Sequence, residues 1–291
     1  MKLLLLSLTT SLVLFIPLKP ASALPLPYKL DATGLVQHSR FAGTRPQPGV
    51  NFDGIVALDD CSGSVVRFTQ SKPSDLAMVL TNGHCVESGF PSPATFISHQ
   101  ASERAFTLLS PEGEKIGDVS AREIVYSSMT KTDMTLYLLD LTFQDLETRY
   151  SVHALTVSSD HPVIGTKIKV ISGYWLKEYN CQVETFIPHL KEGDWTWDDS
   201  VRYSRPGCEV IGGTSGSPVL DADTRSVIAI NNTTNESGEK CTFDNPCEVD
   251  SHGETSFHKG YSYGQETYWL TTCLNEQNQL DLSTPDCQLF H

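Results

Sequence analysis

The sequence predicts an all-β protein. Short runs rich in β-branched residues recur from Ile55 onward, and turn-forming residues separate them at regular intervals. No long stretch of the sequence has helical periodicity. The 291 residues are enough for one large domain or two domains of ordinary size. The clearest runs are residues 64–68, 78–80, 105–109, 134–139, 167–171 and 227–230. They favour a β-sandwich or a set of β-barrels.

The N-terminus has the pattern of a secretory signal peptide. Lys2 gives a positive start, residues 3–16 are apolar, and the small residues 21–23 precede the expected cleavage point. The alternative is a membrane anchor. However, the apolar run is too short to span about 30 Å of hydrocarbon as a helix, and Lys19-Pro20 interrupts any extension. We therefore expect residues 1–23 to be removed and the mature protein to be secreted, with no stable membrane anchor.

The remainder divides into an arm and two β units. Residues 24–50 contain scattered prolines and no clear period, which predicts an irregular N-terminal arm or a propeptide. Residues 142–160 are polar and rich in turn residues, so we place the connection between the β units there. The predicted units are residues 51–150 and residues 151–291, the second with a C-terminal extension.

Composition restricts the partners and the chemistry. The chain has 35 acidic and 21 basic residues, a formal net charge of −14 that would repel phosphate backbones, so we do not expect nucleic acid as a partner. The eight cysteines are even in number, and in an oxidising compartment they indicate disulfides. The sequence has no Cys-x₂-Cys or His-Glu-x-x-His spacing, so it predicts neither a metal site nor a cofactor.

Three segments carry the residue types of nucleophilic catalysis. His84 comes just past an apolar run, Asp133 begins another, and Ser215 lies in a glycine-rich turn. A serine hydroxyl is a poor nucleophile at neutral pH, so a positioned imidazole must take its proton during attack. The imidazole in turn needs a buried carboxylate, which selects its tautomer and stabilises the imidazolium. These three residues are therefore the candidate catalytic group.

The same glycine-rich turn offers an oxyanion hole. Gly213 and Ser215 are two residues apart, an interval at which two backbone N–H groups can converge on the oxyanion of a tetrahedral intermediate. Alternatives stay open for single residues. Clusters of Gly, Ser and Thr often form ordinary turns, and Asp118 and Asp140 lie near Asp133 in sequence.

The order of these residues and their flanking motifs resemble those of the secreted trypsin-like (chymotrypsin-fold) serine peptidases, over roughly residues 51–275. Residues 81–85 keep the Thr, His and Cys of the family's Thr-Ala-x-His-Cys motif. Residues 213–218 read Gly-Thr-Ser-Gly-Ser-Pro, where the family has Gly-Asp-Ser-Gly-Gly-Pro. This variant is similar to that of bacterial-type members.

The resemblance implies two antiparallel six-stranded β-barrels with the active site in the cleft between them. It implies an endopeptidase that cleaves protein or peptide substrates through an acyl-enzyme, with Ser215 as nucleophile, His84 as general base and Asp133 orienting the histidine. The N–H groups of Gly213 and Ser215 would form the oxyanion hole. We expect a monomer. The alternative is a non-catalytic homologue that binds protein partners, but such proteins usually lose a member of the triad, and none is lost here.

The resemblance also implies a role for Glu209, which stands six residues before the nucleophile. In the family this residue lies at the base of the primary specificity pocket, where a carboxylate would favour Arg or Lys in the substrate. The loop from Cys208 to Ser215 is longer than in trypsin, however, so the alternative is a solvated loop charge.

One disulfide follows from the resemblance, because Cys61 and Cys85 correspond to the family's histidine-loop pair. The six other cysteines allow 15 pairings. Closure of short loops favours Cys181–Cys208, Cys241–Cys247 and Cys273–Cys287.

Overall fold

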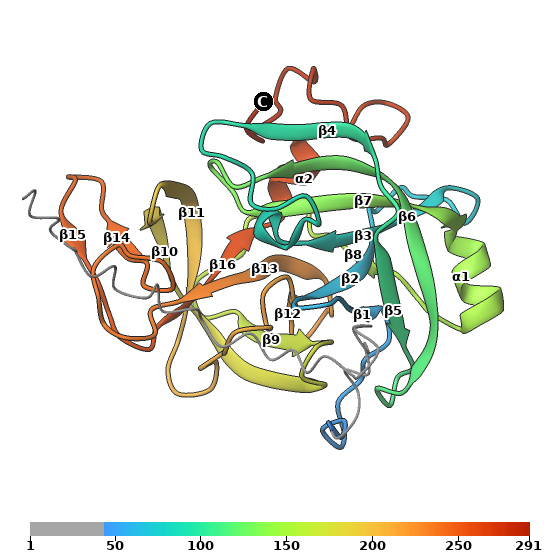
Figure 1. Cartoon of the computed structure of the whole chain (residues 1–291), viewed down its shortest axis with the longest axis horizontal. Helices are drawn as coiled ribbons and strands as arrows, with labels where there is room; N and C mark the ends of the chain where they lie inside the picture. The colour runs from blue at the N-terminus through green and yellow to red at the C-terminus, as the bar shows by residue number, and fades with distance from the viewer. Residues whose placement is uncertain (1–43) are drawn as a thin grey trace, which may run out of the picture. The chain divides into compact units, whose positions relative to one another are not determined.

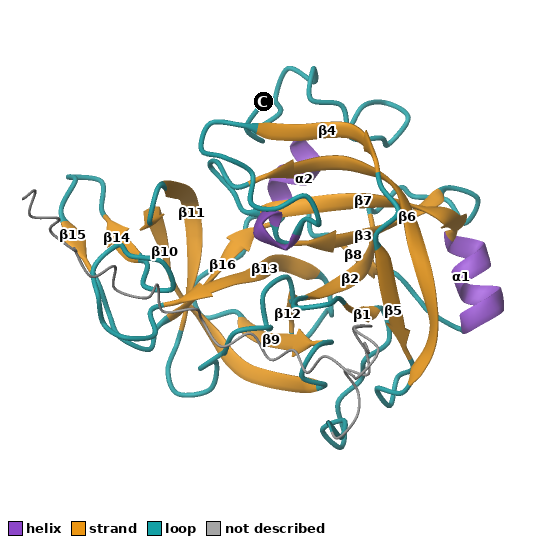
Figure 2. Ribbon diagram, viewed as in Figure 1, coloured by secondary structure: helices purple, strands orange, loops and turns teal. Residues whose placement is uncertain are grey.

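The structure is a computed structural model, and it describes residues 44–291. The predicted signal peptide and residues 24–43 of the predicted arm lie outside the described residues. The described chain is built mainly of β-strands, with a few short helices (Figure 2). The prediction of an all-β protein is therefore confirmed, and each of the six apolar runs falls on a strand.

The first β unit is a closed ring of six antiparallel strands. Its order is β1-β5-β6-β7-β3-β2, and the pairing of β1 with β2 closes it. Two more strands lie outside the ring, β4 against β6 and β8 in parallel against β2. The strands are β1 (Ile55–Ala57), β2 (Ser62–Arg67), β3 (Leu76–Thr81), β4 (Phe96–Ala101), β5 (Ala105–Leu109), β6 (Lys115–Ser128), β7 (Met134–Thr142) and β8 (Leu155–Thr156). Because β8 joins it, the first sheet continues past residue 150.

The second β unit is also a ring of six antiparallel strands. Its order is β11-β16-β13-β12-β9-β10, and the pairing of β10 with β11 closes it. The hairpin strands β14 and β15 extend the sheet from β10. The strands are β9 (Lys167–Ser172), β10 (Lys177–Glu192), β11 (Trp195–Tyr203), β12 (Pro218–Asp221), β13 (Val227–Thr234), β14 (Cys247–Val249), β15 (Thr255–Ser256) and β16 (Ser262–Glu266). The two rings lie side by side (Figure 1). The resemblance to the trypsin-like peptidases implies two six-stranded barrels, and the structure confirms this expectation.

Each ring closes around buried apolar side chains. In the second ring the enclosed residues include Val170, Val183, Val201 and Val219, all fully buried. Alternate residues of a strand point to opposite faces, so β-branched side chains at every second position fill the interior of a ring. This alternation is why the short runs of the sequence predict the strands well.

The connection between the rings contains a helix that the sequence pattern does not predict. Helix α1 (Phe143–Tyr150) begins at Thr142, whose hydroxyl accepts a hydrogen bond from the backbone N–H of Asp145, while the Asp145 carboxylate accepts one from the Thr142 N–H. This reciprocal capping provides hydrogen-bond acceptors for backbone N–H groups that have no partner within the helix at its first turn. Phe143 and Leu146 are the buried residues of the helix. Two short helices complete the chain, the 3₁₀ turn η1 (Gly83–Cys85) and α2 (Tyr268–Thr272).

The C-terminal extension returns to the first ring. Beyond α2, the backbone oxygen of Phe290 accepts a hydrogen bond of 3.0 Å from the Tyr126 hydroxyl, and that of Gln288 accepts one of 2.6 Å from Lys131 Nζ. The rings of Phe96 and Phe290 also meet, with centroids 6.3 Å apart. The last residues therefore pack over β4 and β6, as Figure 1 shows for the segment that ends at the C-terminus.

Four disulfides join the cysteines in pairs, Cys61–Cys85, Cys181–Cys208, Cys241–Cys247 and Cys273–Cys287. These are the pairs that the resemblance and short-loop closure predict. Such a set indicates a protein that folds in an oxidising, extracytoplasmic compartment. No helix within residues 44–291 has the length and hydrophobicity that a transmembrane span requires.

The disulfides allow a prediction about stability. Cys61–Cys85 links residues 24 positions apart, whereas Cys241–Cys247 links residues only 6 apart. Because a cross-link restricts the unfolded chain more when it closes a longer loop, replacing Cys61 and Cys85 by alanine is expected to lower the free energy of unfolding by about 3 kcal/mol, against about 2 kcal/mol for the shorter pair. Urea denaturation of the two double variants measures the difference. A smaller loss for Cys61–Cys85 than for Cys241–Cys247 would contradict the loop-entropy explanation.

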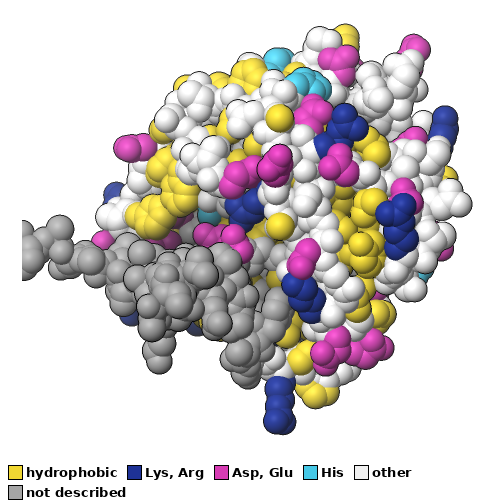
Figure 3. Space-filling model, turned by 45° about the vertical axis from the view of Figure 1, so that its right-hand side comes forward, with side chains coloured by type: hydrophobic (Ala, Val, Ile, Leu, Met, Phe, Trp, Pro, Cys, Tyr) yellow, Lys and Arg dark blue, Asp and Glu magenta, His cyan; other side chains and the backbone are white. Residues whose placement is uncertain are grey.

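The surface carries mixed charge. Acidic side chains are spread over the face that Figure 3 shows, and the Lys and Arg side chains stand between them without gathering into a patch.

Candidate active site

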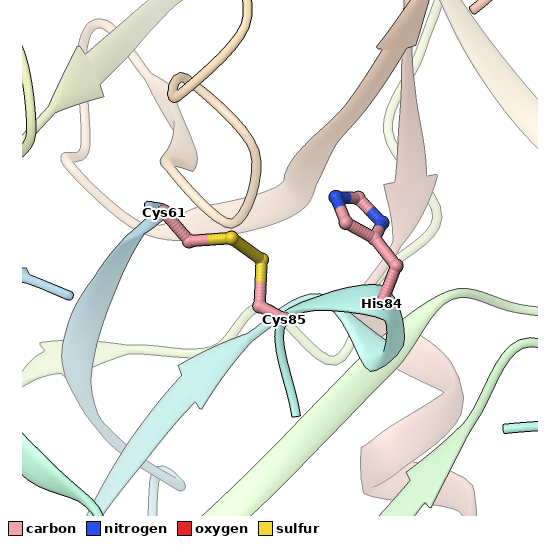
Figure 4. A group of neighbouring side chains, drawn as sticks. All are labelled: Cys61, His84 and Cys85. Atoms are coloured by element: carbon pink, nitrogen blue, oxygen red, sulfur yellow. A yellow bond between two sulfur atoms is a disulfide. The ribbon is translucent and has the colours of Figure 1, made fainter. Parts of the chain in front are cut away.

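Turn η1 presents His84 at the end of strand β3. The turn passes so close to β6 that a Cβ atom on Gly83 would lie 2.1 Å from the backbone oxygen of Ser128. Only glycine fits this approach without displacing backbone. On the other side of the turn, the disulfide of Cys85 ties η1 to Cys61, and the His84 ring projects away from the disulfide (Figure 4). The histidine thus stands on a turn that is held at both ends.

Asp133 orients His84 through two hydrogen bonds. Its Oδ2 lies 2.7 Å from His84 Nδ1, and its Oδ1 accepts the backbone N–H of His84 at 3.0 Å. Asp133 is fully buried just before strand β7, and Asn82 donates a hydrogen bond of 2.8 Å to its backbone oxygen. The contact with Nδ1 leaves Nε2 as the ring nitrogen that is able to accept a proton.

Burial alone would lower the pKa of His84. The negative charge of Asp133 and its hydrogen bond outweigh that effect and raise the pKa above its usual value of 6.5, and the charge of Glu192 adds to the rise. A histidine with this environment takes up a proton readily near neutral pH, which suits a general base.

The turn that carries Ser215 has a backbone conformation that favours glycine. Gly213 has φ of +85°, and a Cβ atom there would lie 2.8 Å from the Tyr174 ring. The backbone oxygen of Gly212 accepts a hydrogen bond of 2.7 Å from Trp175 Nε1. Since the C=O and N–H of a trans peptide point in opposite directions, Trp175 holds the Gly213 N–H facing away from itself. No motif in the sequence indicates this role for Trp175.

Further hydrogen bonds fix Ser215 between the two rings. Its backbone oxygen accepts the Ser62 N–H of β2 at 2.8 Å, and the next residue, Gly216, donates its N–H to Asn231 of β13 at 2.9 Å. The Ser215 hydroxyl lies 3.5 Å from the backbone oxygen of Asn232. Hydrogen bonds of Ser215 and of the next residue therefore connect the segment of the candidate nucleophile to the first ring on one side and to the second ring on the other.

His84 and Ser215 line one cavity of about 110 Å³. Aromatic side chains form part of its wall: Phe90 meets the His84 ring edge-on with centroids 5.8 Å apart, and it stacks on Phe243 at 5.9 Å. Trp195 lies edge-on against Phe90 from the other side, at 6.0 Å. The cavity next to the two candidate catalytic side chains therefore has a partly aromatic wall.

Three acidic residues also line this cavity, Glu192, Glu236 and Asp244. Burial raises the pKa of Glu192 to about 7, although its carboxylate accepts hydrogen bonds from the Thr233 hydroxyl at 2.6 Å and from the Asp244 N–H at 3.0 Å. Burial likewise raises the pKa values of Glu236 and Asp244. These residues come from the end of β10 and the segment after β13, and no sequence motif connects them with the candidate catalytic residues.

Glu209 does not line the cavity. Its side chain is exposed, 3.3 Å from Arg205 Nε, and it accepts the backbone N–H of Gly207 at 2.9 Å. The longer loop before Ser215 turns this carboxylate outward. Its position is therefore that of a solvated charge on the loop, and not that of a residue at the base of a specificity pocket.

The two other candidate aspartates also lie away from His84. Asp118 is bonded to Lys115 at 2.6 Å and to the Thr107 hydroxyl at 2.8 Å, and Asp140 is exposed on β7. Cys61, His84 and Cys85 lie close enough together to resemble a metal-binding group, but both sulfur atoms belong to the disulfide and are not available as thiolate ligands.

A family model described as a trypsin-like peptidase domain matches residues 61–230. No curated protein sequence matches the chain. Among solved structures, the MamO protease domain from Magnetospirillum magneticum is similar with a TM-score of 0.47 and 13% identity, over 79% of this chain and 100% of that one. The protease Anisep from Arthrobacter nicotinovorans has a TM-score of 0.43 and 15% identity, over 76% and 92%. Nocardiopsis protease has a TM-score of 0.41 and 15% identity, over 75% and 91%.

The family match spans more than half of the chain. It covers the strands that lead to His84 and Asp133, and it ends within β13, beyond Ser215. The chain belongs to the trypsin-like peptidase family.

Proposed function

We propose that the protein is a secreted serine endopeptidase in which Ser215, His84 and Asp133 form the catalytic triad. The observation that carries the proposal is the 2.7 Å contact between His84 Nδ1 and Asp133 Oδ2, with His84 and Ser215 lining the same cavity. Family membership makes proteins or peptides the substrates.

The proposed reaction has two stages. Ser215 Oγ attacks the carbonyl carbon of the scissile peptide bond while His84 Nε2 takes the hydroxyl proton, and Asp133 stabilises the imidazolium. The N–H groups of Gly213 and Ser215 bind the oxyanion of the tetrahedral intermediate. His84 then gives its proton to the leaving amine as the C–N bond breaks, which leaves an acyl-enzyme. Water, deprotonated by the same histidine, attacks the acyl-enzyme, and Ser215 leaves with the proton restored.

The test of this proposal is covalent labelling with a fluorophosphonate, followed by peptide mapping. We expect the label on Ser215, because the reagent needs an activated serine. Ser217→Ala is the matched control: it removes a buried hydroxyl two residues away and should not prevent labelling. If the folded, mature protein took up no label, the alternative of a non-catalytic homologue that binds protein partners would be favoured instead.

We further propose that the cavity prefers substrates with Arg or Lys side chains. The support is the set of three acidic residues in the cavity, of which Glu192 is the most buried. A cation beside a partly desolvated carboxylate gains a charge-assisted hydrogen bond that a neutral side chain cannot make. Glu209 has no part in this preference, because it lies outside the cavity.

This preference is expected to depend on pH. Below pH 7 the Glu192 carboxyl carries a proton and is neutral; above it the group is negative, because its pKa is about 7. The ratio of kcat/KM for an arginine substrate to that for its neutral analogue citrulline should therefore rise by about 10-fold from pH 6 to pH 8. Protonation of His84 affects both substrates equally and cancels in the ratio.

The variants Glu192→Gln and Glu209→Gln separate the two positions. The first should remove most of the pH dependence of the ratio, and the second should leave it unchanged. A ratio that is independent of pH in the wild-type protein, or that responds to Glu209→Gln, would show that Glu192 does not select the substrate.

A further inference from the structure

The second ring contains a group of three potential metal ligands outside the proposed active site. His161 Nε2 lies 3.1 Å from Asp199 Oδ2 and 3.7 Å from Glu266 Oε1, and the three ligand atoms lie within 4.8 Å of one another. Asp199 belongs to β11, Glu266 ends β16, and His161 lies in the connection that enters the second ring. None of the three lines the cavity of His84 and Ser215.

The burial of Glu266 is unusual, because within the part of the chain that the structure describes its carboxylate has none of the hydrogen bonds that a buried carboxylate normally makes. It is 1% exposed, and neither of its carboxylate oxygens has a hydrogen-bond partner within residues 44–291. A buried carboxyl group in this condition is costly, because the lost hydration is not replaced. Glu266 Oε1 faces His161 Nε2, so a cation bound between the histidine and the two carboxylates would supply the partner that the buried group lacks.

His161 is arranged as a metal-binding histidine usually is. Its Nδ1 lies 2.6 Å from the backbone oxygen of Pro162, which selects the tautomer with the proton on Nδ1. The lone pair is then on Nε2, the atom that faces both carboxylates. The ring is held from the sides by Phe186, with centroids 4.4 Å apart, and by Tyr268 at 5.4 Å.

The spacing of the three atoms also fits a metal. Zn²⁺ binds histidine nitrogen and carboxylate oxygen at about 2.0–2.2 Å, and tetrahedral geometry then separates neighbouring ligand atoms by about 3.4 Å. The distances from His161 Nε2, 3.1 Å and 3.7 Å, lie on either side of this value. We propose that His161, Asp199 and Glu266 bind a divalent transition-metal ion, Zn²⁺ in the first place, with water in the fourth position.

The consequence of such a site is structural. His161 comes before β9 in the connection between the rings, whereas Asp199 and Glu266 lie on neighbouring strands of the second ring. An ion bound by all three would fasten the connection to that ring. No short metal-binding motif in the sequence could reveal the group, because its three members are far apart in the chain. The proposal departs from the sequence-based expectation that no metal site is present.

The test is calorimetric titration of the purified, chelator-treated protein with Zn²⁺, together with its melting temperature. We expect one equivalent to bind, and the melting temperature to rise by about 5–10 °C when free Zn²⁺ is about 100 times its Kd. Glu266→Gln and His161→Gln should each weaken binding by more than about 100-fold. Because His161 is part-exposed, its variant tests the proposal even if Glu266→Gln folds poorly. Co²⁺ should give visible absorption bands in the wild-type protein that both variants lose.

The matched control is His189→Gln. His189 and Asp198 form a similar exposed pair, with Nδ1 and Oδ1 2.7 Å apart, but they belong to no group of three such side chains within residues 44–291. This variant should bind Zn²⁺ as the wild-type protein does. Failure of the wild-type protein to bind Zn²⁺, or binding that survives both Glu266→Gln and His161→Gln, would mean that the three residues form ion pairs only.

Discussion

Replacing Ser215 by alanine is expected to lower kcat for peptide hydrolysis by about 10⁴- to 10⁶-fold. The variant lacks the oxygen that forms the acyl-enzyme, so only the oxyanion hole and substrate binding remain to accelerate attack by water. Initial rates with a fluorogenic peptide measure the loss. KM should change little, because the hydroxyl is small and the cavity keeps its other walls.

The same assay contains its controls. Ser217→Ala should keep nearly full activity, and circular dichroism should show that both variants fold. The Ser215 variant is expected to remain folded because its backbone, which bonds to Ser62, is unchanged. Activity that persists in Ser215→Ala would assign the nucleophile to another residue and reject the proposed triad.

Replacing Asp133 by asparagine is expected to lower kcat by about 10³- to 10⁴-fold. Asparagine is nearly the same size, but its amide group can donate a hydrogen bond to His84 Nδ1. The proton of the neutral imidazole would then sit on Nε2, where it prevents that nitrogen from accepting the serine proton. The variant should also move the acidic limb of the pH–rate profile to lower pH. The reason is that burial lowers the pKa of His84, and the negative charge and hydrogen bond of Asp133, which oppose the effect of burial, are gone.

Asp140→Asn is the matched control for this second variant. Asp140 lies on β7, the strand that Asp133 immediately precedes, and was a candidate on sequence grounds, but its side chain is exposed. We expect unchanged activity and an unchanged pH profile. A large loss in Asp140→Asn, or none in Asp133→Asn, would contradict the assignment of the orienting carboxylate.

Local patterns were sufficient to predict most of the fold. Ile168 and Val170 illustrate why: both belong to the short run 167–171, whose successive side chains alternate between the two faces of a sheet, and both lie in the core of the second ring. Helix α1 was not predicted because two turns of helix are too short to show a periodic pattern. Its one clear signal is the pair Thr142 and Asp145, at the spacing of a capping box.

The candidate site was predictable where its residues belong to contiguous motifs. His84 and Ser215 each lie within a motif of a few residues, so they could be identified without three-dimensional information. The acidic residues of the cavity were not predictable in this way. Glu192, for example, reaches the cavity from the β10–β11 hairpin, which has no such motif. Glu209 shows the opposite error: counting residues back from Ser215 assumes a loop length that this chain does not have.

The return of the last residues to the first ring affects how the protein is made. During synthesis the first ring leaves the ribosome well before Gln288 and Phe290, whose backbone oxygens bond to Lys131 and Tyr126. The proposed nucleophile also arrives late, because Ser215 forms its hydrogen bond to β2, a strand that was translated more than a hundred residues earlier. The nascent chain therefore passes through a long interval in which the histidine side of the site exists without the serine. Residues 288–290 therefore complete the packing of the first ring only after the strands of both rings have been translated.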